Sequence, residues 1–371
     1  MAAQAGGAFN VYVGTYTKGQ GAGRPQSEGI YVYRMDATTG ALTHAHTTPG
    51  VVNPSFLTLA PSRRFLYAVN EVQDAEGKSG GGVSAFAVDA ATGVLTYLNQ
   101  QSTNGADPCH VSVDHAGAYL LVANYGSGSV AMFPTQADGR LGSASDFVQH
   151  QGSSVNPRRQ QGPHAHSITP DPGNRYALAA DLGLDKVLVY RLDATPGKLI
   201  PNSPPSASVA PGAGPRHLAF HPNGRLVYLI NEIGSTVTVF GYDAGSGGLR
   251  ELQTLSTLPA DFTGTSHCAD IHVAPNGRYV YGSNRGHDSL AIFAVDSTTG
   301  ALTAVGHAPT GGRTPRNFAI DPTGAFVLAA NQNSDTIVTF RINQETGALT
   351  PTGAVAQVPS PVCIQFAPLA G

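Results

Sequence analysis

A cation and a carboxylate stand at the two ends of one short repeat unit, Gly214–Glu232. The unit predicts two β-strands, His217–Phe220 and Leu226–Ile230, because each apolar segment is too short for a helix and the intervening His-Pro-Asn-Gly supplies turn residues. Antiparallel pairing places the start of the first strand beside the end of the second. Arg216 and Glu232 should therefore lie together at one edge of the sheet, where a guanidinium could bind an anion.

The same unit recurs along the chain, and its strand-end positions carry different polar residues in different copies. The candidate site residues at or beside these positions are Glu71, His110, His164, His166, Arg216, His217, Glu232, Asp270, Arg285 and Arg316. A purely structural position should repeat one residue type, as Asn70, Asn124, Asn231, Asn284 and Asn331 do. Several arginines and histidines at one rim predict a site for a small anion. The alternative is a ring of Arg–Glu salt bridges that only ties the repeats together.

Two of the candidate histidines compete for one role. His164 and His166 are two residues apart, so in a regular strand they would point the same way, with His166 one step deeper. Neutral imidazole, with an ordinary pKa of about 6.5, is suited to accept a proton near neutrality. His110 and His217 are expected to be structural histidines that border the substrate. The pattern leaves open which of the first two histidines would act as a base.

The elements that must position these residues are short strands in a regular repeat. A second repeated motif, typified by Asp-Ala-Thr-Thr-Gly-Ala-Leu, has its glycines at Gly40, Gly93, Gly139, Gly197, Gly247, Gly300 and Gly347. A period of about fifty residues with four short strands in each period is typical of a β-propeller. We therefore expect an all-β, seven-bladed propeller with four-stranded blades, which forms a single domain over residues 1–371 with a disordered N-terminus over residues 1–8.

One strand of the repeat is missing at the start of the chain. The segment Phe9–Thr17 matches the second strand of the unit, and its first strand occurs instead at the other end of the chain, as Pro361–Pro368. We expect Val362–Phe366 to pair with Val11–Tyr16 as the innermost strand of that blade. Such pairing closes the ring and removes an exposed sheet edge.

Composition excludes several classes of protein. The 371 residues include 45 Gly and 26 Pro, and charged residues make up only 12%. This composition suits an all-β chain rich in turns and argues against disorder. The net charge of −3 argues against a nucleic-acid partner. Three cysteines indicate no disulfide framework, and neither a signal peptide nor a membrane span is apparent. We expect a cytoplasmic protein without a membrane partner, as a monomer or weak homodimer.

A broader pattern of motifs resembles a known family. The series GPH, GPRH-x-x-F-H-P-N, Y-x-x-NE and ADIH, with a later SNR, resembles the seven-bladed β-propeller lactonases over essentially the whole chain. That family includes propeller-type 6-phosphogluconolactonases and the 3-carboxy-cis,cis-muconate lactonising enzymes. The resemblance implies a catalytic set of His164, Arg216, Glu232 and Arg285, a small anionic lactone as substrate and no cofactor. The loops Lys18–Glu28, Gln73–Gly82 and Gly152–Gln161, the last with Arg158 and Arg159, depart from the family and should set substrate choice.

The residues suit lactone hydrolysis, which needs a base for water, donors for the oxyanion and a cationic clamp for the acid group. No dinucleotide, phosphate-loop or HExxH motif is present. A non-catalytic binding propeller would share the fold but should present an apolar or aromatic surface where these strand ends meet. A calcium-dependent lactonase would need carboxylates that converge on the axis, whereas Glu71, Asp181, Glu232 and Asp270 fall in different repeats. The sequence thus favours a metal-independent lactonase and leaves lactone hydrolysis and muconate cyclisation both open.

Overall fold

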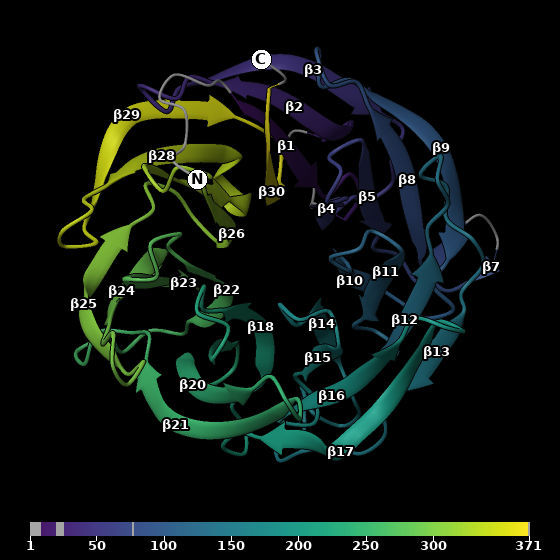
Figure 1. The fold of residues 1–371 in the computed structure, drawn as a ribbon. Helices are drawn as coiled ribbons and strands as arrows, with labels where there is room; N and C mark the ends of the chain where they lie inside the picture. The colour runs from purple at the N-terminus through teal and green to yellow at the C-terminus, as the bar shows by residue number, and fades with distance from the viewer. Residues whose placement is uncertain (1–8, 20–25, 76–77, 370–371) are drawn as a thin grey trace.

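The computed structural model describes residues 9–19, 26–75 and 78–369, and within them seven four-stranded antiparallel sheets surround a central axis (Figure 1). The seven-bladed propeller expected from the repeat is confirmed. The expected disorder of residues 1–8 lies outside the described residues. No helix in the described part of the chain has the length and apolarity needed to cross a membrane.

The blades are numbered in chain order, and the strands of each are given from the channel outward. Blade 1 contains β30 (Pro361–Pro368), β1 (Phe9–Thr15), β2 (Gly29–Met35) and β3 (Leu42–Pro49). Blade 2 contains β4 (Leu57–Leu59), β5 (Phe65–Asn70), β8 (Gly82–Val88) and β9 (Leu95–Ser102). Blade 3 contains β10 (Pro108–Val113), β11 (Tyr119–Asn124), β12 (Ser129–Pro134) and β13 (Asp146–Gln149). Blade 4 contains β14 (Ala165–Pro170), β15 (Tyr176–Asp181), β16 (Lys186–Asp193) and β17 (Lys198–Ser208).

The remaining blades follow the same order. Blade 5 contains β18 (Pro215–Phe220), β19 (Leu226–Asn231), β20 (Thr236–Asp243) and β21 (Gly248–Ser256). Blade 6 contains β22 (His267–Val273), β23 (Tyr279–Arg285), β24 (Ser289–Val295) and β25 (Leu302–Pro309). Blade 7 contains β26 (Pro315–Ile320), β27 (Phe326–Asn331), β28 (Thr336–Ile342) and β29 (Leu349–Gln357). A small hairpin, β6 (Asp74–Ala75) with β7 (Lys78–Ser79), and a 3-10 turn, η1 (Gln332–Ser334), lie between these strands.

The ring closes as expected, through the last strand of the chain. The antiparallel register of β30 on β1 pairs Val11 with Phe366 and Val13 with Ile364. Figure 1 shows β30 (yellow) beside β1 (purple), at the inner edge of the blade that begins the chain. β30 thus supplies the fourth strand of blade 1 and links the two ends of the chain within one sheet.

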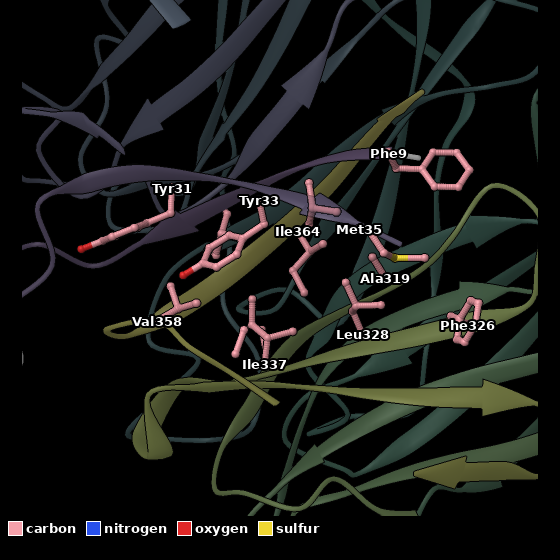
Figure 2. Packing of buried hydrophobic residues seen from close by; sticks show 14 residues of the cluster. Phe9, Tyr31, Tyr33, Met35, Ala319, Phe326, Leu328, Ile337, Val358 and Ile364 are labelled. Carbon is pink, nitrogen blue, oxygen red and sulfur yellow. The ribbon is translucent and has the colours of Figure 1, made fainter. Parts of the chain in front are cut away.

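Neighbouring blades are held together by apolar side chains that pack face to face. In the interface of blades 7 and 1, Phe326, Leu328 and Ile337 contact a cluster that includes Tyr33 and Ile364, all buried (Figure 2). Burial of such side chains is the main favourable contribution to folding. The periodic Asp-Gly turns join in this packing, because a Cβ on Gly40 would lie 2.8 Å from the Phe326 ring.

The inner strands begin at one end of the channel with an irregularity that aims side chains into it. The register of β18 on β19 shifts between Pro215 and His217, so Arg216 is an extra, bulged residue. β10 and β26 have matching shifts, at Cys109 and Arg316. A bulge bends its strand and redirects a side chain, and bulges are frequent beside active sites. We call this end of the channel the mouth.

The same bulge corrects the expected arrangement of the two competing histidines. β14 begins at Ala165, so His164 precedes the strand, and the register shift between Ala165 and Ser167 makes His166 the bulged residue. The expectation that both histidines lie in one regular strand is therefore wrong, although both rings contact the Tyr125 ring. Since Ala165 pairs with Asp181 as Pro215 pairs with Asn231, His166 is the counterpart of Arg216.

Candidate active site

Glu232 is the centre of the largest charge cluster at the mouth. Its Oε2 atom lies 3.0 Å from Arg216 Nε and 3.0 Å from Arg285 Nη2, and its Oε1 atom lies 2.7 Å from Arg159 Nη2. Only 7% of the Glu232 side chain is exposed, with 3% for Arg216, 16% for Arg285 and 34% for Arg159. The pairing of Arg216 with Glu232 expected from the hairpin is confirmed.

These neighbours keep Glu232 ionised. Burial alone favours the neutral acid, but Arg285 and Arg216 outweigh it and hold the pKa of Glu232 well below its usual value. Burial together with Arg285 and Arg316 lowers the pKa of Arg216 to about 10, so this guanidinium is still a cation at neutral pH. Arg285 also donates from Nη2 to the Cys268 carbonyl at 2.8 Å. Among the described residues its Nη1 atom has no hydrogen-bond partner, which leaves a donor for a ligand.

Arg159 belongs to this cluster although the repeat pattern does not predict it. It comes from the loop that joins β13 to β14, and Nη2 also donates to the Tyr125 hydroxyl at 3.1 Å. The buried Gln160 fixes this loop, because its Nε2 donates to the Leu182 carbonyl at 2.8 Å and its Oε1 accepts from the Asn156 backbone at 3.0 Å. The only signal in the sequence is an arginine pair in a loop that breaks the repeat.

His164 lies beside this cluster, with one nitrogen fixed and the other available. Its ring stacks on the Tyr125 ring at 4.6 Å between centroids, and Nδ1 lies 2.9 Å from the Tyr125 carbonyl oxygen. A carbonyl only accepts hydrogen bonds, so Nδ1 carries the proton and Nε2 of the neutral ring presents a lone pair. Within the described residues that nitrogen has no hydrogen-bond partner. The structure brings His164 close to Arg159 through Tyr125, without a direct contact to Glu232.

His166 lies deeper and has partners on both sides. Its Nε2 atom is 3.8 Å from Glu232 Oε2, and its Nδ1 atom is 3.6 Å from Cys109 Sγ. Burial, followed by the charge of Arg216, lowers the pKa of His166 well below its ordinary value. The ring is therefore neutral and enclosed, which suits a residue that supports Glu232 more than one that meets water.

A layer of rings fills the channel below the mouth. Phe56 contacts His110 at 4.5 Å between centroids, and His217 contacts both His110 at 5.5 Å and His166 at 5.3 Å. His110 accepts a hydrogen bond from the Ile168 backbone at 3.3 Å. We call these four rings the floor. His110 and His217 are buried in it, with partners, as expected for structural histidines.

Asp270, in β22 of blade 6, holds one ring of the floor in place. Its Oδ1 atom lies 2.8 Å from His217 Nδ1, and its Oδ2 atom accepts from Asn317 Nδ2. Burial favours protonation of Asp270, but the adjacent His272 and His217 hold its pKa well below the usual value. With Nδ1 of His217 directed at Asp270, Nε2 faces Arg216 Nη1 at 3.3 Å. Asp270 thus orients His217, and His217 supports Arg216.

A second polar cluster occupies the wall formed by blades 1, 2 and 7. The Tyr16 hydroxyl donates to both carboxylate oxygens of Glu71 at 2.9 Å, and the Ser55 hydroxyl donates to Oε2. The Arg316 guanidinium lies over the Tyr16 ring, 5.4 Å from its centroid. Arg316 makes no hydrogen bond to another described residue, so its donors are available to an anion. Glu71 and Arg316 thus belong to one cluster, which is separate from the ion pairs of Glu232.

The described side chains at the mouth do not assemble a metal site. Across residues 9–19, 26–75 and 78–369, no group of three or more His, Cys, Asp or Glu side chains is arranged to hold a metal ion. Glu232 and Asp270 are each engaged by cationic or histidine partners, and Glu71 by hydroxyl groups. The arrangement can therefore supply a free imidazole base, several guanidinium donors and two carboxylates in unlike surroundings.

Comparison with known proteins agrees with this geometry. The family described as "Lactonase, 7-bladed beta-propeller" matches residues 10–366. A 6-phosphogluconolactonase of Bacillus subtilis is 41% identical over 355 residues, which cover 96% of this chain and 97% of that protein. A 6-phosphogluconolactonase of Formosa agariphila is 35% identical over 84% of this chain and 86% of its own length. The solved periplasmic gluconolactonase of Pseudomonas aeruginosa superposes with a TM-score of 0.91 at 38% identity, covering 98% of this chain and 100% of that one.

Proposed function

We propose that this chain, a lactonase that belongs to the seven-bladed β-propeller lactonase family, hydrolyses 6-phosphogluconolactone to 6-phosphogluconate by general-base catalysis without a metal. The observation that carries the mechanism is the free Nε2 of His164, set beside the arginine cluster by the Tyr125 carbonyl. The relatives named 6-phosphogluconolactonase support the substrate.

His164 acts as the base in this mechanism. Its Nε2 takes a proton from water as the water oxygen attacks the lactone carbonyl, and the Nδ1 bond to Tyr125 keeps the ring oriented. A positioned base contributes about 10²- to 10⁴-fold in rate. The competing candidate, His166, already has Glu232 and Cys109 beside its two nitrogens, which supports His164 for this role.

The arginines stabilise the negative charge that develops on the carbonyl oxygen. Arg285 has Nη1 available, and Arg159 reaches the mouth from its loop beside His164. Glu232 pairs with both guanidinium groups and holds them in fixed positions, so they need no rearrangement during the reaction. Arg216 is almost entirely buried, so it contributes through its charge and by holding Glu232 in place.

Arg316 binds the phosphate of the substrate in this proposal. It is the guanidinium at the mouth without a carboxylate contact among the described residues, and planar guanidinium donors match phosphate oxygens. Glu71, one of the candidate site residues in the sequence pattern, lies on the same wall and is assigned to substrate binding here. His166, His110, His217 and Asp270 contribute as the support beneath the substrate.

Location and assembly are further parts of the proposal. Cys109, Cys268 and Cys363 are buried free thiols, which supports a cytoplasmic location, whereas the Pseudomonas relative is described as periplasmic. We propose a monomer or weak homodimer whose partner is the small anionic lactone, with neither a nucleic acid nor a membrane as partner. Cell fractionation and light scattering of the purified protein test these points.

The activity is tested with purified protein and three substrates. These are 6-phosphogluconolactone, unphosphorylated gluconolactone and 3-carboxy-cis,cis-muconate, each with and without a chelator and with spontaneous hydrolysis subtracted. We expect fastest turnover of the phosphorylated lactone and no loss on chelation. Turnover of the muconate alone would show a cycloisomerase, and no turnover of any of the three would favour a binding propeller.

A further inference from the structure

Two glutamates at the mouth, Glu71 and Glu232, have different surroundings. Glu232 forms ion pairs with three arginines, whereas among the described residues Glu71 accepts hydrogen bonds only from the hydroxyls of Tyr16 and Ser55. Among the described residues no lysine or arginine forms an ion pair with Glu71. When two acids share one site and their environments push their pKa values apart, the pair divides ionised and protonated roles between them.

The surroundings of Glu71 favour a protonated carboxyl. Burial raises its pKa above the ordinary value, and Arg316 and the two hydroxyls oppose that rise without cancelling it. The groups that face Glu71 are Tyr16 and Ser55 through hydrogen bonds, Arg316 and Asp107 through their charge, and the Cys109 thiol, whose pKa is raised by burial. Within the described part of the chain Glu71 Oε1 bonds only to Tyr16, so it has a direction left for a proton shared with a ligand.

The chemistry of the proposed substrate matches this wall. In a 6-phosphorylated δ-lactone the phosphate is carried by the carbon next to the one that bears the ring oxygen. A phosphate on Arg316 therefore brings the ring oxygen toward the same wall, where Tyr16 joins Arg316 to Glu71. The carbonyl end is then directed across the channel, toward His164 and the arginines around Glu232. The ring oxygen becomes an alkoxide leaving group, which needs a proton because alkoxides are strongly basic.

We propose that Glu71 is the general acid of the reaction, which protonates the ring oxygen as the bond from that oxygen to the carbonyl carbon breaks, with Tyr16 and Ser55 as its positioning residues. This inference rests on the proposed function. His164, Arg216, Glu232 and Arg285 remain the base and oxyanion side of the same site.

The protons and bonds balance over one turnover. Water gives one proton to His164 Nε2, and its oxygen bonds to the carbonyl carbon. The tetrahedral intermediate then collapses, the bond to the ring oxygen breaks, and that oxygen takes the Glu71 proton. The product carboxylic acid loses its proton to solvent, and the His164 proton returns to Glu71 through solvent. The net change is addition of one water molecule to the lactone and release of one proton.

Binding of the phosphorylated substrate should raise the pKa of Glu71 further. In the free protein the positive charge of Arg316 is the main influence that lowers the pKa of Glu71 against burial. A phosphate dianion paired with Arg316 offsets that charge, so Glu71 stays protonated to higher pH in the complex. A lactone without phosphate leaves Arg316 unpaired and the acid more readily ionised, which links substrate choice to the rate of ring opening.

The test is the pH profile of Glu71→Gln, which keeps the shape of the side chain but carries no acidic proton. Wild-type kcat should fall at alkaline pH as Glu71 ionises. In the variant kcat should drop by about 10²-fold and lose that alkaline limb, while KM changes by less than about three-fold. Tyr16→Phe should retain the limb and lose about ten-fold in kcat. Arg316→Gln should instead raise KM for the phosphorylated lactone by about 10- to 100-fold.

Asp107→Asn is the matched control, because it removes a charge from the same side of the mouth without touching the proposed acid. Asp107 raises the pKa of Glu71, so this variant should keep the alkaline limb and move it to lower pH. Asparagine also tolerates the positive φ of 50° at this position. If the alkaline limb of Asp107→Asn lies at the same pH as that of wild type, the group that ionises there is not Glu71.

The outcomes separate this inference from the proposed function. If the wild type turns over 6-phosphogluconolactone and a folded Glu71→Gln protein keeps its kcat and its alkaline limb, the lactonase stands and the role of Glu71 is refuted. If the wild type fails on that substrate, the proposed function fails and the inference falls with it. The melting temperature and binding of 6-phosphogluconate establish that the variant is folded with an intact site.

Discussion

Replacement of Glu232 by Gln should destabilise the protein, because it leaves three guanidinium groups facing one another without their shared carboxylate. Arg216 and Arg285 are 3.0 Å from that carboxylate and largely buried, so water cannot replace it well. Breaking a buried ion pair by removing one partner costs about 3–5 kcal/mol. The third pair, with the 34% exposed Arg159, adds little because solvent screens it. At about 2 °C per kcal/mol for a large chain, the melting temperature should fall by roughly 6–10 °C at pH 7.

The difference in melting temperature between wild type and Glu232→Gln should depend on pH, because Glu232 must be ionised to pair with the arginines. Its pKa is held well below the usual value in the folded protein. The stability it contributes is therefore complete above the unfolded-chain pKa of about 4.3 and is lost as the pH falls from there toward the folded pKa. Melting curves of wild type and Glu232→Gln, recorded from pH 7 to pH 3, should converge on the acidic side.

The companion variant Glu71→Gln makes the same chemical change at the same mouth and serves as the control. The raised pKa of Glu71 means that its ionised form costs stability as the pH rises. Removal of that acid should leave the melting temperature at pH 7 unchanged or slightly higher. Inorganic phosphate should stabilise Glu232→Gln more than wild type, since an anion can replace the lost carboxylate. A Glu232→Gln protein that melts within 2 °C of wild type at pH 7 would refute the reasoning.

Other variants test the remaining roles. His164→Ala should lower kcat by about 10²- to 10⁴-fold, and if His166→Ala abolishes turnover of a folded protein while His164→Ala does not, the base is the deeper histidine. Arg216→Lys keeps the positive charge but loses the planar guanidinium group that faces Glu232. A large loss of kcat would show that the guanidinium geometry is required, and full activity would show that the charge is sufficient. Prolonged EDTA treatment should leave the rate unchanged, and loss restored by calcium would contradict the metal-independent mechanism. Deletion of residues 362–371 removes most of β30 and should abolish cooperative unfolding near the wild-type temperature.

The repeat made the fold and half of the site predictable. Six continuous copies of one strand-turn-strand unit and a seventh divided between the chain ends specify the blades, and the missing first strand predicts the pairing of β30 with β1. The contact of Arg216 with Glu232 follows from the same unit, because it depends only on which strand ends meet. Such contacts lie within one repeat, where periodicity determines what is adjacent.

The remainder depends on features that have no period. Arg159 reaches Glu232 from a loop whose path is set by Gln160, and no pattern in the sequence indicates that path. His166, and not His164, is the counterpart of Arg216 because a bulge inserts one residue, and strict alternation along the strand does not predict that. Tyr16 meets Glu71 across two blades, so their hydrogen bond becomes visible only after the ring has closed.

The two carboxylates show how a repetitive fold acquires a direction for its chemistry. Glu71 and Glu232 occupy equivalent positions after β5 and β19, and their backbones are held in the same way by the repeat. Their surroundings differ: Glu232 has arginines from its own blade, from blade 6 and from a loop, whereas Glu71 has hydroxyls from its own blade and from blade 1. One carboxylate is therefore kept ionised by its partners and the other is pushed toward its neutral form. A lactone bound between them has its carbonyl directed at fixed positive charge and its leaving oxygen at a proton donor, which is the polarity that ring opening requires.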